Sequence, residues 1–314
     1  MPTNSIVDRV DGAALIPEEA AREIIQATTE ASAVMSVARR LPNMSRKQLR
    51  VPVVSTQPTA YFVTGDTGLK QTTDMAWDNV YLNAEELAVI VPMPTALLDD
   101  ADYNIADEMR PHLVEAFGKA IDAAILFGTN KPTTWPAAIR AAAIAAGNSV
   151  ALGTGADVYD DLLGDAGVWS LVEADGYMVN GTIAATGFMG KLRALRDADG
   201  TPLFINNMRD NVGAYSILGS PCFFPRNGGF DASATWAFSG DWSQIVYSIR
   251  QDITYTIADQ GVITDNAGNV VYNLFQQDMV ALRAVMRVAV AVPNPVNRLQ
   301  ATAANRYPIG VLTT

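Results

Sequence analysis

Side chains that could perform catalysis or bind a metal ion are few in this sequence, and none of them cluster. The one histidine, His112, has no second imidazole with which to share a metal ion and no partner base, so we expect a surface or interface residue. Cys and His never recur at metal-ligand spacing, and the HExxH motif of zinc proteases does not occur. The sequence therefore indicates no catalytic residues, no metal site and no enzymatic activity.

Two glycine-containing stretches could suggest phosphate binding, but their spacing does not fit. GTGADV at 153–158 lacks the third glycine of a dinucleotide-binding loop, and no convincing strand precedes it. GDTGLKQT at 65–72 has the wrong interval between glycine and lysine for a phosphate loop, and no helix follows it. We interpret both stretches as turns and expect no cofactor.

The remaining reactive or titratable residues favour structural roles. Adjacent carboxylates occur at Glu85 and Glu86, Asp99 and Asp100, and Asp160 and Asp161. Such pairs on an acidic protein are usually a solvated surface, so we assign them no chemistry. Cys222 is the single cysteine, which excludes an intramolecular disulfide and suits a reducing compartment. We expect it to be a small buried hydrophobic residue.

Charge and hydropathy exclude two further classes of protein. Thirty-three acidic against twenty-two basic residues give a net charge of −11, and no segment gathers Lys or Arg, so tight DNA binding is not expected. Neither a signal peptide nor a run of about eighteen apolar residues occurs, so we expect no membrane span. Only 18% of the 314 residues are charged, less than the usual quarter or so, and part of the surface should therefore be covered by another molecule.

The first half of the chain carries the strongest signals for secondary structure. After a short arm at 1–16, residues 17–41 have a first-turn proline, acids at the start and arginines at the end, which predicts a helix. LRVPVVS at 49–55 alternates as a strand does. Residues 105–128 repeat apolar side chains every four positions and predict a helix roughly 35 Å long. Pro111 inside this helix should bend it.

Between that strand and that helix lies a polar arm, TAYFVTGDTGLKQTTDMAWDN at 59–79, which we interpret as a long two-stranded hairpin. Gly65, Asp66, Thr67 and Gly68 are turn residues at its tip, and strand-forming aromatic side chains occupy both legs. A hairpin of this length is marginal in water, because two isolated strands cannot bury a face against each other. We therefore expect something outside the hairpin to supply the missing surface.

The second half of the chain alternates between loops, short helices and strands. A loop is expected over 95–104 and a turn-rich connection over 131–155. Helices are predicted over 157–175 and 186–200, a strand over 176–185, and long β-rich runs over 240–259 and 270–292. No internal repeat with a fixed period occurs.

This order of elements resembles the major capsid proteins of tailed bacteriophages, which have the Hong Kong 97 fold, and the resemblance covers nearly the whole chain. In that family an extended loop precedes a long spine helix, and an α/β domain follows. DADGTPL at 197–203 is similar to a D-x-x-G-x-P-L turn of the family, GDWS at 240–243 to a strand start, and VALRAVMRVAVAV at 280–292 to the final strands. Each motif is weak alone, but their order and spacing together are specific.

The resemblance implies an α+β fold with four parts. An N-terminal arm spans 1–16, and the extended β-hairpin loop spans 58–80. A peripheral domain takes in 17–57, 81–127 and 244–285, with the spine helix at 105–128. An axial α/β domain takes in 128–243 and 286–314.

The resemblance also implies a shell protein of the virion that assembles through hexamers and pentamers into the icosahedral head of a tailed phage or prophage. The extended loop would lie across a neighbouring subunit, and a bend at Pro111 would let one sequence fit rings of five and six. Loop residues expected at this contact are Tyr61, Phe62, Val63, Gly65, Asp66, Gly68, Leu69, Lys70, Met75 and Trp77.

Further partners follow from the same resemblance. A separate scaffolding protein is expected, because only residues 1–16 precede the first predicted helix, together with a portal and a decoration protein. The shell would enclose double-stranded DNA without sequence-specific binding, because an acidic wall repels phosphate. Assembly is expected in the host cytoplasm, without a membrane.

Some members of this family join subunits by an isopeptide bond between a lysine on the extended loop and an asparagine, assisted by a glutamate. Lys70 lies in the matching part of the arm, and Asn294 and Asn297 are candidate acceptors. No glutamate lies near these asparagines, because the last one in the sequence is Glu173. We therefore expect Lys70 to make a polar contact with the neighbouring subunit and not a covalent bond.

Two alternative functions stay open from sequence alone. A bacterial encapsulin nanocompartment has a similar fold but holds cargo enzymes, and electron microscopy for packed DNA and a portal vertex would separate it from a phage shell. A soluble α/β hydrolase would be a monomer or small oligomer with a polar catalytic cluster. Size-exclusion chromatography discriminates here, since a capsid protein should elute as capsomers or shells.

Overall fold

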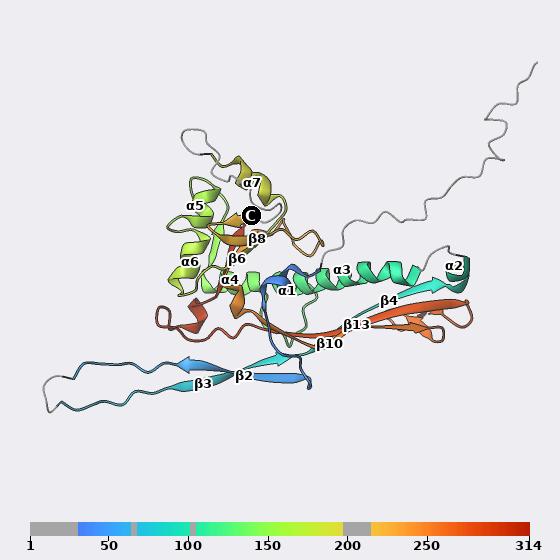
Figure 1. Cartoon of the computed structure of the whole chain (residues 1–314), viewed down its shortest axis with the longest axis horizontal. Helices are drawn as coiled ribbons and strands as arrows, with labels where there is room; N and C mark the ends of the chain where they lie inside the picture. Colours follow the sequence, from blue (N-terminus) through green and yellow to red (C-terminus); the bar gives the residue numbers. More distant parts are fainter. Residues whose placement is uncertain (1–30, 64–67, 101–104, 197–214) are drawn as a thin grey trace, which may run out of the picture.

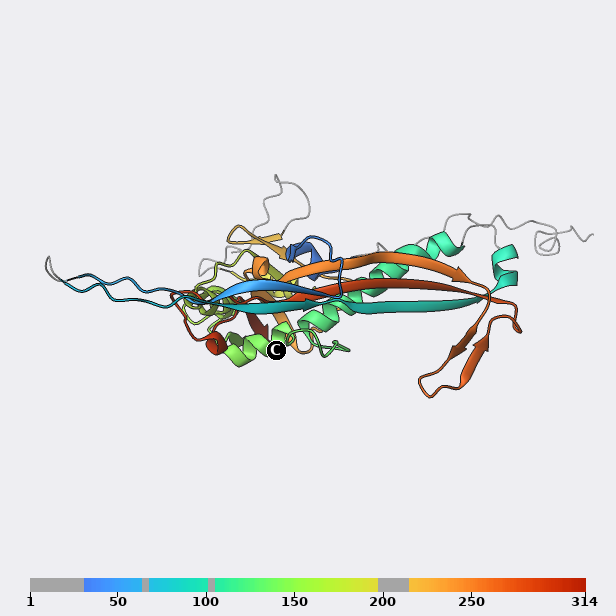
Figure 2. The same ribbon diagram turned by 90° about the horizontal axis from the view of Figure 1, so that it is seen from below.

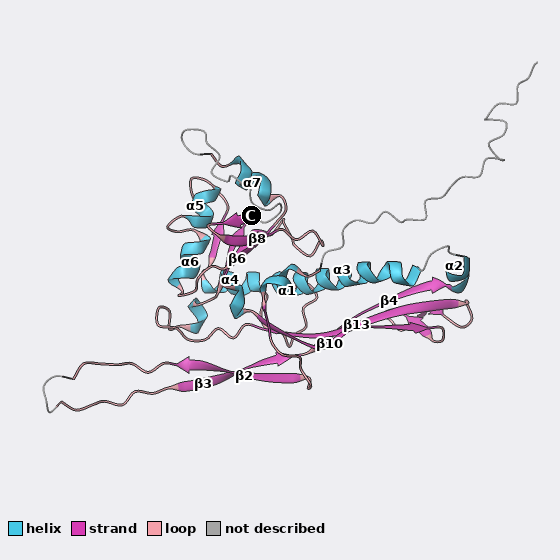
Figure 3. Cartoon of the chain, viewed as in Figure 1, coloured by secondary structure: helices cyan, strands magenta, loops and turns pink. Residues whose placement is uncertain are grey.

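The computed structural model of the chain describes residues 31–63, 68–100, 105–196 and 215–314, and it is an elongated α+β molecule with a projecting arm (Figures 1 and 3). The helices are α1 (Ala33–Val37), α2 (Thr95–Asp100), α3 (Ile105–Leu126), α4 (Ile139–Ala146), α5 (Val158–Leu163), α6 (Val168–Ala174), α7 (Phe188–Ala194) and the 3-10 turns η2 (Trp242–Gln244) and η3 (Ala303–Asn305). The strands are β1 (Arg39–Arg40), β2 (Gln48–Thr56), β3 (Ala76–Asn83), β4 (Glu85–Pro94), β5 (Ser149–Ala151), β6 (Gly181–Ala184), β7 (Tyr215–Ile217), β8 (Ser220–Phe223), β9 (Thr235–Gly240), β10 (Val246–Ala258), β11 (Val262–Thr264), β12 (Val270–Asn273), β13 (Met279–Ala291) and β14 (Ile309–Thr313).

A four-stranded sheet forms the elongated part of the molecule. Its order is β1-β10-β13-β4, and β13 pairs antiparallel with both of its neighbours. β10 and β13 have 13 residues each, which corresponds to about 40 Å of strand. The long helix α3 lies along this sheet (Figures 1 and 2), and its Leu113 and Phe117 are buried against Leu282 and Ala284 of β13.

A six-stranded sheet forms the second part, with the order β5-β14-β9-β6-β8-β7. Its strand directions are mixed, because β14 pairs antiparallel with β9 and parallel with β5. The short helices α5, α6 and α7 surround this sheet (Figure 1), and Trp169 of α6 and Phe188 of α7 are buried there.

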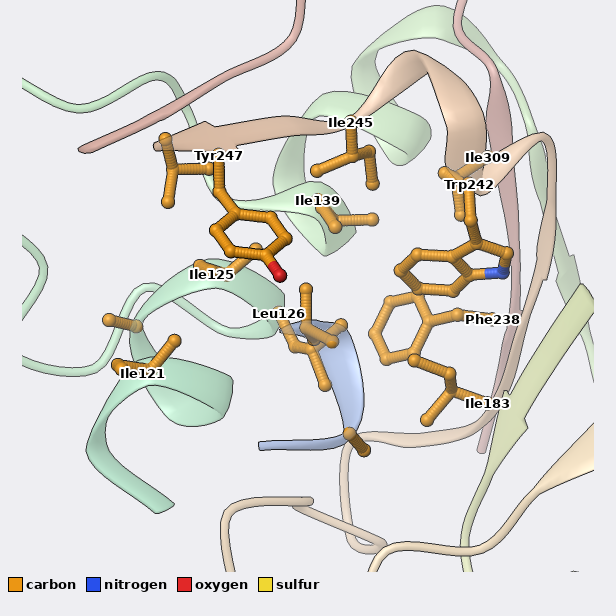
Figure 4. Close-up of a cluster of buried hydrophobic side chains, with 14 of the residues drawn as sticks. Ile121, Ile125, Leu126, Ile139, Ile183, Phe238, Trp242, Ile245, Tyr247 and Ile309 are labelled. Atoms are coloured by element: carbon orange, nitrogen blue, oxygen red, sulfur yellow. The ribbon is translucent and has the colours of Figure 1, made fainter. Parts of the chain in front are cut away.

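One hydrophobic core joins the two sheets at the end of α3. Figure 4 shows Leu126 of this helix next to Phe238 and Ile183 of the six-stranded sheet, and Ile121 and Ile125 belong to the same buried cluster. Ile249 and Val288 of the four-stranded sheet belong to the same buried cluster. Because both sheets contribute to one core, they hold a fixed position relative to α3.

The helix predicted over 17–41 does not extend through its described part. α1 covers only Ala33–Val37, since Ser32 is an extended N-cap whose side chain accepts a hydrogen bond from the Met35 N–H. Arg39 and Arg40 then pair with β10, and the Arg39 N–H donates to the Ile245 carbonyl at 2.9 Å. Helical propensity is a weak preference that such distant pairing overrides. Residues 17–30, and the arm at 1–16, lie outside the described residues.

Two further predictions of local structure were wrong. The helix predicted over 157–175 is two helices, α5 and α6, separated at Gly164, where a side chain could not fit because its Cβ would lie 2.5 Å from the Asp160 carbonyl. The segment 95–104, expected to be a loop, begins with helix α2.

Other predictions agree more closely with the structure. α3 confirms the long helix and runs continuously through Pro111, while a bend at this proline stays a prediction. The β-rich runs contain β10 and β13, and the strand predicted over 176–185 is confined to β6. The connection over 131–155 contains α4, which ends at Gly147 with φ of 91°. The DADGTPL turn lies outside the described residues.

Candidate intersubunit surfaces

The arm is rooted in an antiparallel ladder between β2 and β3. Its register runs from Gln48 opposite Asn83 to Thr56 opposite Ala76, and the described residues beyond it, 57–63 and 68–75, form no strand. The prediction of a paired hairpin over 59–79 was therefore wrong for most of its length. Pairing persists only where the rest of the molecule supports the ladder, as expected for two strands that cannot stabilise each other.

One face of this ladder is anchored to the four-stranded sheet. Leu49 lies opposite Leu82 and Val51 opposite Val80, which places these four side chains on the same face. Leu82 is completely buried, and the cluster around it includes Val246 of β10 and two alanines of β13. The root of the arm is thus part of the folded core.

The opposite face of the ladder exposes two large aromatic side chains. Trp77 lies opposite Val54, and Tyr81 lies opposite Arg50. Trp77 is 63% exposed and Tyr81 is 48% exposed. Aromatic side chains with this exposure are typical anchors of protein interfaces.

The unpaired legs of the arm carry the most exposed apolar side chains at its end. Phe62 and Leu69 are 104% and 90% exposed, and Tyr61, Val63 and Met75 are also exposed. Lys70 is exposed as well, and Gly68 is half-buried. Between the described parts of the legs, the Tyr61 hydroxyl donates a hydrogen bond to the Gln71 carbonyl. Gly65 and Asp66 lie outside the described residues.

Three hydrogen bonds tie the base of the arm to the segment that follows β13. The Val296 N–H donates to the Val54 carbonyl at 3.1 Å, and the Gln57 side chain donates to the Val296 carbonyl at 3.0 Å. Arg298 donates to the Pro58 carbonyl at 2.7 Å. The direction in which the arm leaves the subunit is therefore fixed by contacts far apart in sequence, which no local pattern could indicate.

Both candidate asparagines are engaged within their own subunit. The Asn294 side chain accepts from the Tyr177 hydroxyl at 2.9 Å and donates to the Arg306 carbonyl at 2.9 Å. Asn297 donates to the Asp175 carbonyl at 2.6 Å and accepts from the Gln300 N–H at 2.8 Å. The hydrogen bonds of these two amides stabilise the loops after β13. The candidate lysine, Lys70, lies on the arm.

A second exposed apolar surface, which sequence analysis did not identify, lies on the hairpin formed by β11 and β12. This hairpin projects from the four-stranded sheet (Figure 2). Its exposed apolar side chains, with those next to it, are Ile257, Val262, Val270, Val271, Tyr272 and Phe275. The run VVYNLF at 270–275 was a detectable signal, because it places five large apolar residues among six.

The described residues contain no group of three or more His, Cys, Asp or Glu that could hold a metal ion. His112 is exposed on α3, and Cys222 is buried, which raises the pKa of its thiol to about 12. No described helix is long and apolar enough to cross a membrane.

Of the acidic pair at 160–161, Asp160 is exposed as predicted for a solvated surface, but Asp161 is not. Asp161 is buried, and its carboxylate accepts from the N–H groups of Gly153 and Gly155 at 2.7 and 2.6 Å. It thereby occupies the glycine-rich turn that could have suggested phosphate binding. At the other described pair, Glu86 forms an ion pair with Arg287 at 2.6 Å. The side chains of the pair at 99–100 lie outside the described residues.

Comparisons with known proteins agree with one another. The sequence profile of the phage capsid family matches residues 12–298. The major capsid protein of Staphylococcus phage 80alpha is 28% identical over 272 residues, covering 86% of this chain and 79% of that protein. A solved chain from Microbacterium phage Oxtober96 is 33% identical with a TM-score of 0.85, covering 98% of this chain and 99% of that one. Another, from Mycobacterium phage Cain, is 32% identical with a TM-score of 0.83 and 98% coverage of each chain.

Proposed function

This chain belongs to the phage capsid family and is a major capsid protein with a Hong Kong 97-type fold, and from that premise we propose that its arm clamps neighbouring subunits together in the virion shell. The family resemblance of the sequence is thereby confirmed. One observation carries the proposal: the side chains of Phe62 and Leu69, on the legs of the arm, are 104% and 90% exposed and so are not covered by the described part of their own subunit. Burial of each such side chain against another copy would contribute roughly 1.5–3 kcal/mol.

The position of the arm supports assembly into rings. The arm extends away from the rest of its subunit in both views (Figures 1 and 2), so its partner surface must lie on a different part of the next copy. A contact between unlike surfaces closes into a ring when the rotation between copies permits it. We propose that hexamers and pentamers form in this way and build an icosahedral head. A bend of α3 at Pro111 would adapt the subunit to both rings.

The β11–β12 hairpin supplies a second contact in this proposal. It projects from the four-stranded sheet, whereas the arm extends from the opposite end of the molecule (Figure 2). Within a ring, each arm and the surface that binds it are already in contact with each other. Joining rings into a closed shell therefore needs another surface. The exposed side chains around Val271 and Phe275 fit that role.

Several finer features belong to the same proposal. The peripheral domain would comprise 17–57, 81–127 and 244–285, and the axial domain 128–243 and 286–314, with the extended loop at 58–80. The chain would be non-enzymatic, would assemble in the host cytoplasm with a separate scaffolding protein, and would meet a portal and a decoration protein. Its net charge of −11 supports enclosure of double-stranded DNA without tight binding to it.

We also propose that assembly does not crosslink the subunits. Asn294 and Asn297 are occupied by hydrogen bonds that stabilise their own loops, and the last glutamate in the sequence is Glu173. A denaturing gel of boiled shells tests this proposal. A single band at the mass of one chain is expected, and a ladder of covalent oligomers would contradict it.

Removal of the arm tests the clamp. Replacement of residues 59–73 by a short glycine-serine linker keeps the β2–β3 ladder, which ends at Thr56 and Ala76. We expect a folded subunit with the parent's circular dichroism spectrum that elutes as a small species and forms no shells in electron micrographs. Regular shells from this variant would overturn the clamp. Packed DNA in parent particles isolated from lysed host cells would separate a phage head from a nanocompartment filled with enzymes.

A further inference from the structure

A hollow of about 420 Å³ opens between α3 and the start of β4. Alanines of α3 at 116, 120 and 123 form one wall, Leu87 of β4 and Val288 of β13 form another, and the buried indole of Trp135 closes part of the floor. The size falls within the range of about 300–1,000 Å³ that is typical of binding pockets. Because one wall consists of alanines, the hollow can accept large apolar side chains.

The chain segment that leads toward residues 1–30 starts on the other side of α3. Its Ser32 lies against Gly118, where an added Cβ would be 2.8 Å from the Ser32 nitrogen. With 3.6 residues per turn, Gly118 points about 160° away from Ala116 and Ala120. The hollow is therefore not covered where the N-terminal segment joins the body of the subunit.

We propose that this hollow receives the end of the arm of a second copy, with Phe62 and Leu69 of that copy entering it. This inference rests on the proposed function, because it names the surface on which the clamp closes. The subunit's own arm extends away from its body (Figures 1 and 2), so the occupant comes from a neighbour. The match is chemical: the hollow is mainly apolar, and the arm ends in two of the most exposed apolar side chains of the described chain.

Charge adds a second element of complementarity. Lys70 follows Leu69 on the arm and is exposed. The hollow is lined by the charged residues Glu85, Glu86 and Lys119. Glu86 is paired with Arg287, and the Glu85 carboxylate accepts a 2.7 Å hydrogen bond from the Thr134 hydroxyl. An arm seated with Leu69 in the hollow would bring the Lys70 ammonium group next to the Glu85 carboxylate.

Disulfide trapping between two populations of subunits tests the contact. Both carry Cys222→Ala, one adds Leu69→Cys and the other Ala116→Cys, so that a covalent dimer forms only between different copies. Mixed shells should give this dimer on a non-reducing gel after mild oxidation. The matched control is Val114→Cys, which is exposed on the same helix but about 160° around it from Ala116. Dimers with Val114→Cys as abundant as those with Ala116→Cys would overturn the proposal, as would shells that yield neither.

Filling the hollow gives an independent readout. Ala120→Trp should reduce the yield of shells at least tenfold while the unassembled subunit keeps the parent's elution volume and melting temperature. Normal shells from Ala120→Trp would overturn the proposal. These experiments test the clamp and its proposed binding surface separately. If the arm-deleted variant forms no shells but Leu69 and Ala116 do not crosslink, the arm binds elsewhere on its neighbour. If the arm-deleted variant forms shells, the clamp itself is wrong.

Discussion

At the scale of single residues, Asp122 joins three segments that are distant in sequence. Its buried carboxylate on α3 accepts from the Ser32 hydroxyl at 2.5 Å, from the N–H groups of Ala33 and Val34 at 2.9 and 3.1 Å, and from the Asn227 side chain at 2.7 Å. The first turn of α1 and the loop before β9 are thereby fixed to the long helix. Burial raises the pKa of Asp122, and these hydrogen bonds partly oppose that effect.

Removal of this carboxylate should destabilise the subunit. Asp122→Ala leaves buried donors without an acceptor, which we expect to lower the free energy of unfolding by about 2–4 kcal/mol. Since the folded pKa of Asp122 lies above its unfolded value, the parent gains stability from this group as the pH falls through the folded pKa toward the unfolded pKa. The difference between parent and variant should therefore be larger at pH 4.5 than at pH 7, as measured by urea denaturation of unassembled subunits.

Asp231 provides the control for this measurement, because its shift has the opposite sign. Its exposed carboxylate accepts hydrogen bonds from the side chain and the N–H of Ser233, which lower its pKa. Its contribution is present at neutral pH and is lost as the pH falls through the folded pKa. The effect of Asp231→Ala should thus shrink on acidification. A parallel pH dependence for both variants would contradict this account of Asp122.

Cys222 gives a second prediction at the residue scale. Burial raises the pKa of its thiol to about 12, so almost none of the thiol is ionised at pH 8 in the folded subunit. The thiolate is the reactive form, and the side chain is also inaccessible. We expect a thiol reagent such as Ellman's to label Cys222 only after urea unfolds the subunit. Labelling of the native protein as fast as that of the unfolded chain would show that this part of the sheet opens.

At the scale of elements, local sequence patterns predicted the helices and strands whose formation depends on nearby residues. The four-residue repeat of apolar side chains placed α3 within two residues of its observed end at Leu126. The alternation of Leu49, Val51 and Val53 predicted β2, because one face of that strand packs on the core. The pairing of β1 with β10 and the end of the β2–β3 ladder depend on distant segments. The pattern within either segment could not reveal them.

The same limit applies to the candidate surfaces. Exposed aromatic residues in the arm were predictable, because their types suit strands but the hairpin has no partner sheet. The hollow beside α3 was not, since it is bounded by Leu87, Val288 and Trp135, which lie far apart in the sequence. The role of Asp161 was also hidden, because only the folded turn directs the Gly153 and Gly155 N–H groups at its carboxylate.

The arm ladder allows assembly and folding to be separated by a matched pair of variants. Trp77 is exposed on the outer face, and Leu82 is completely buried on the inner face of the same strand. Leu82→Ala should lower the free energy of unfolding by about 2–4 kcal/mol because it leaves a cavity. Trp77→Ala should change it by less than about 0.5 kcal/mol and should instead reduce shell yield. Equal losses in subunit stability would show that Trp77 belongs to the core.

At the scale of the whole molecule, two groups of exposed apolar side chains lie far apart. The legs of the arm lie at one end, and the β11–β12 hairpin projects near the other (Figure 2). Between them, one continuous core fixes both sheets to α3. The subunit therefore presents two separated apolar surfaces joined by one core, which suits the proposed shell with contacts within rings and contacts between rings.

Disabling the hairpin should separate these two kinds of contact. In the variant Val271→Ser with Phe275→Ser, both replaced side chains are exposed in the subunit, so we expect subunit stability to change by less than about 1 kcal/mol. The arm is intact, so native mass spectrometry should still detect rings, whereas electron microscopy should find few closed shells. Ile144→Ser, which removes a 41% exposed apolar side chain from α4, is the control and should assemble normally. Closed shells at the parent's yield from the hairpin variant would place the contact between rings elsewhere, because loss of two apolar anchors must weaken any interface that buries them.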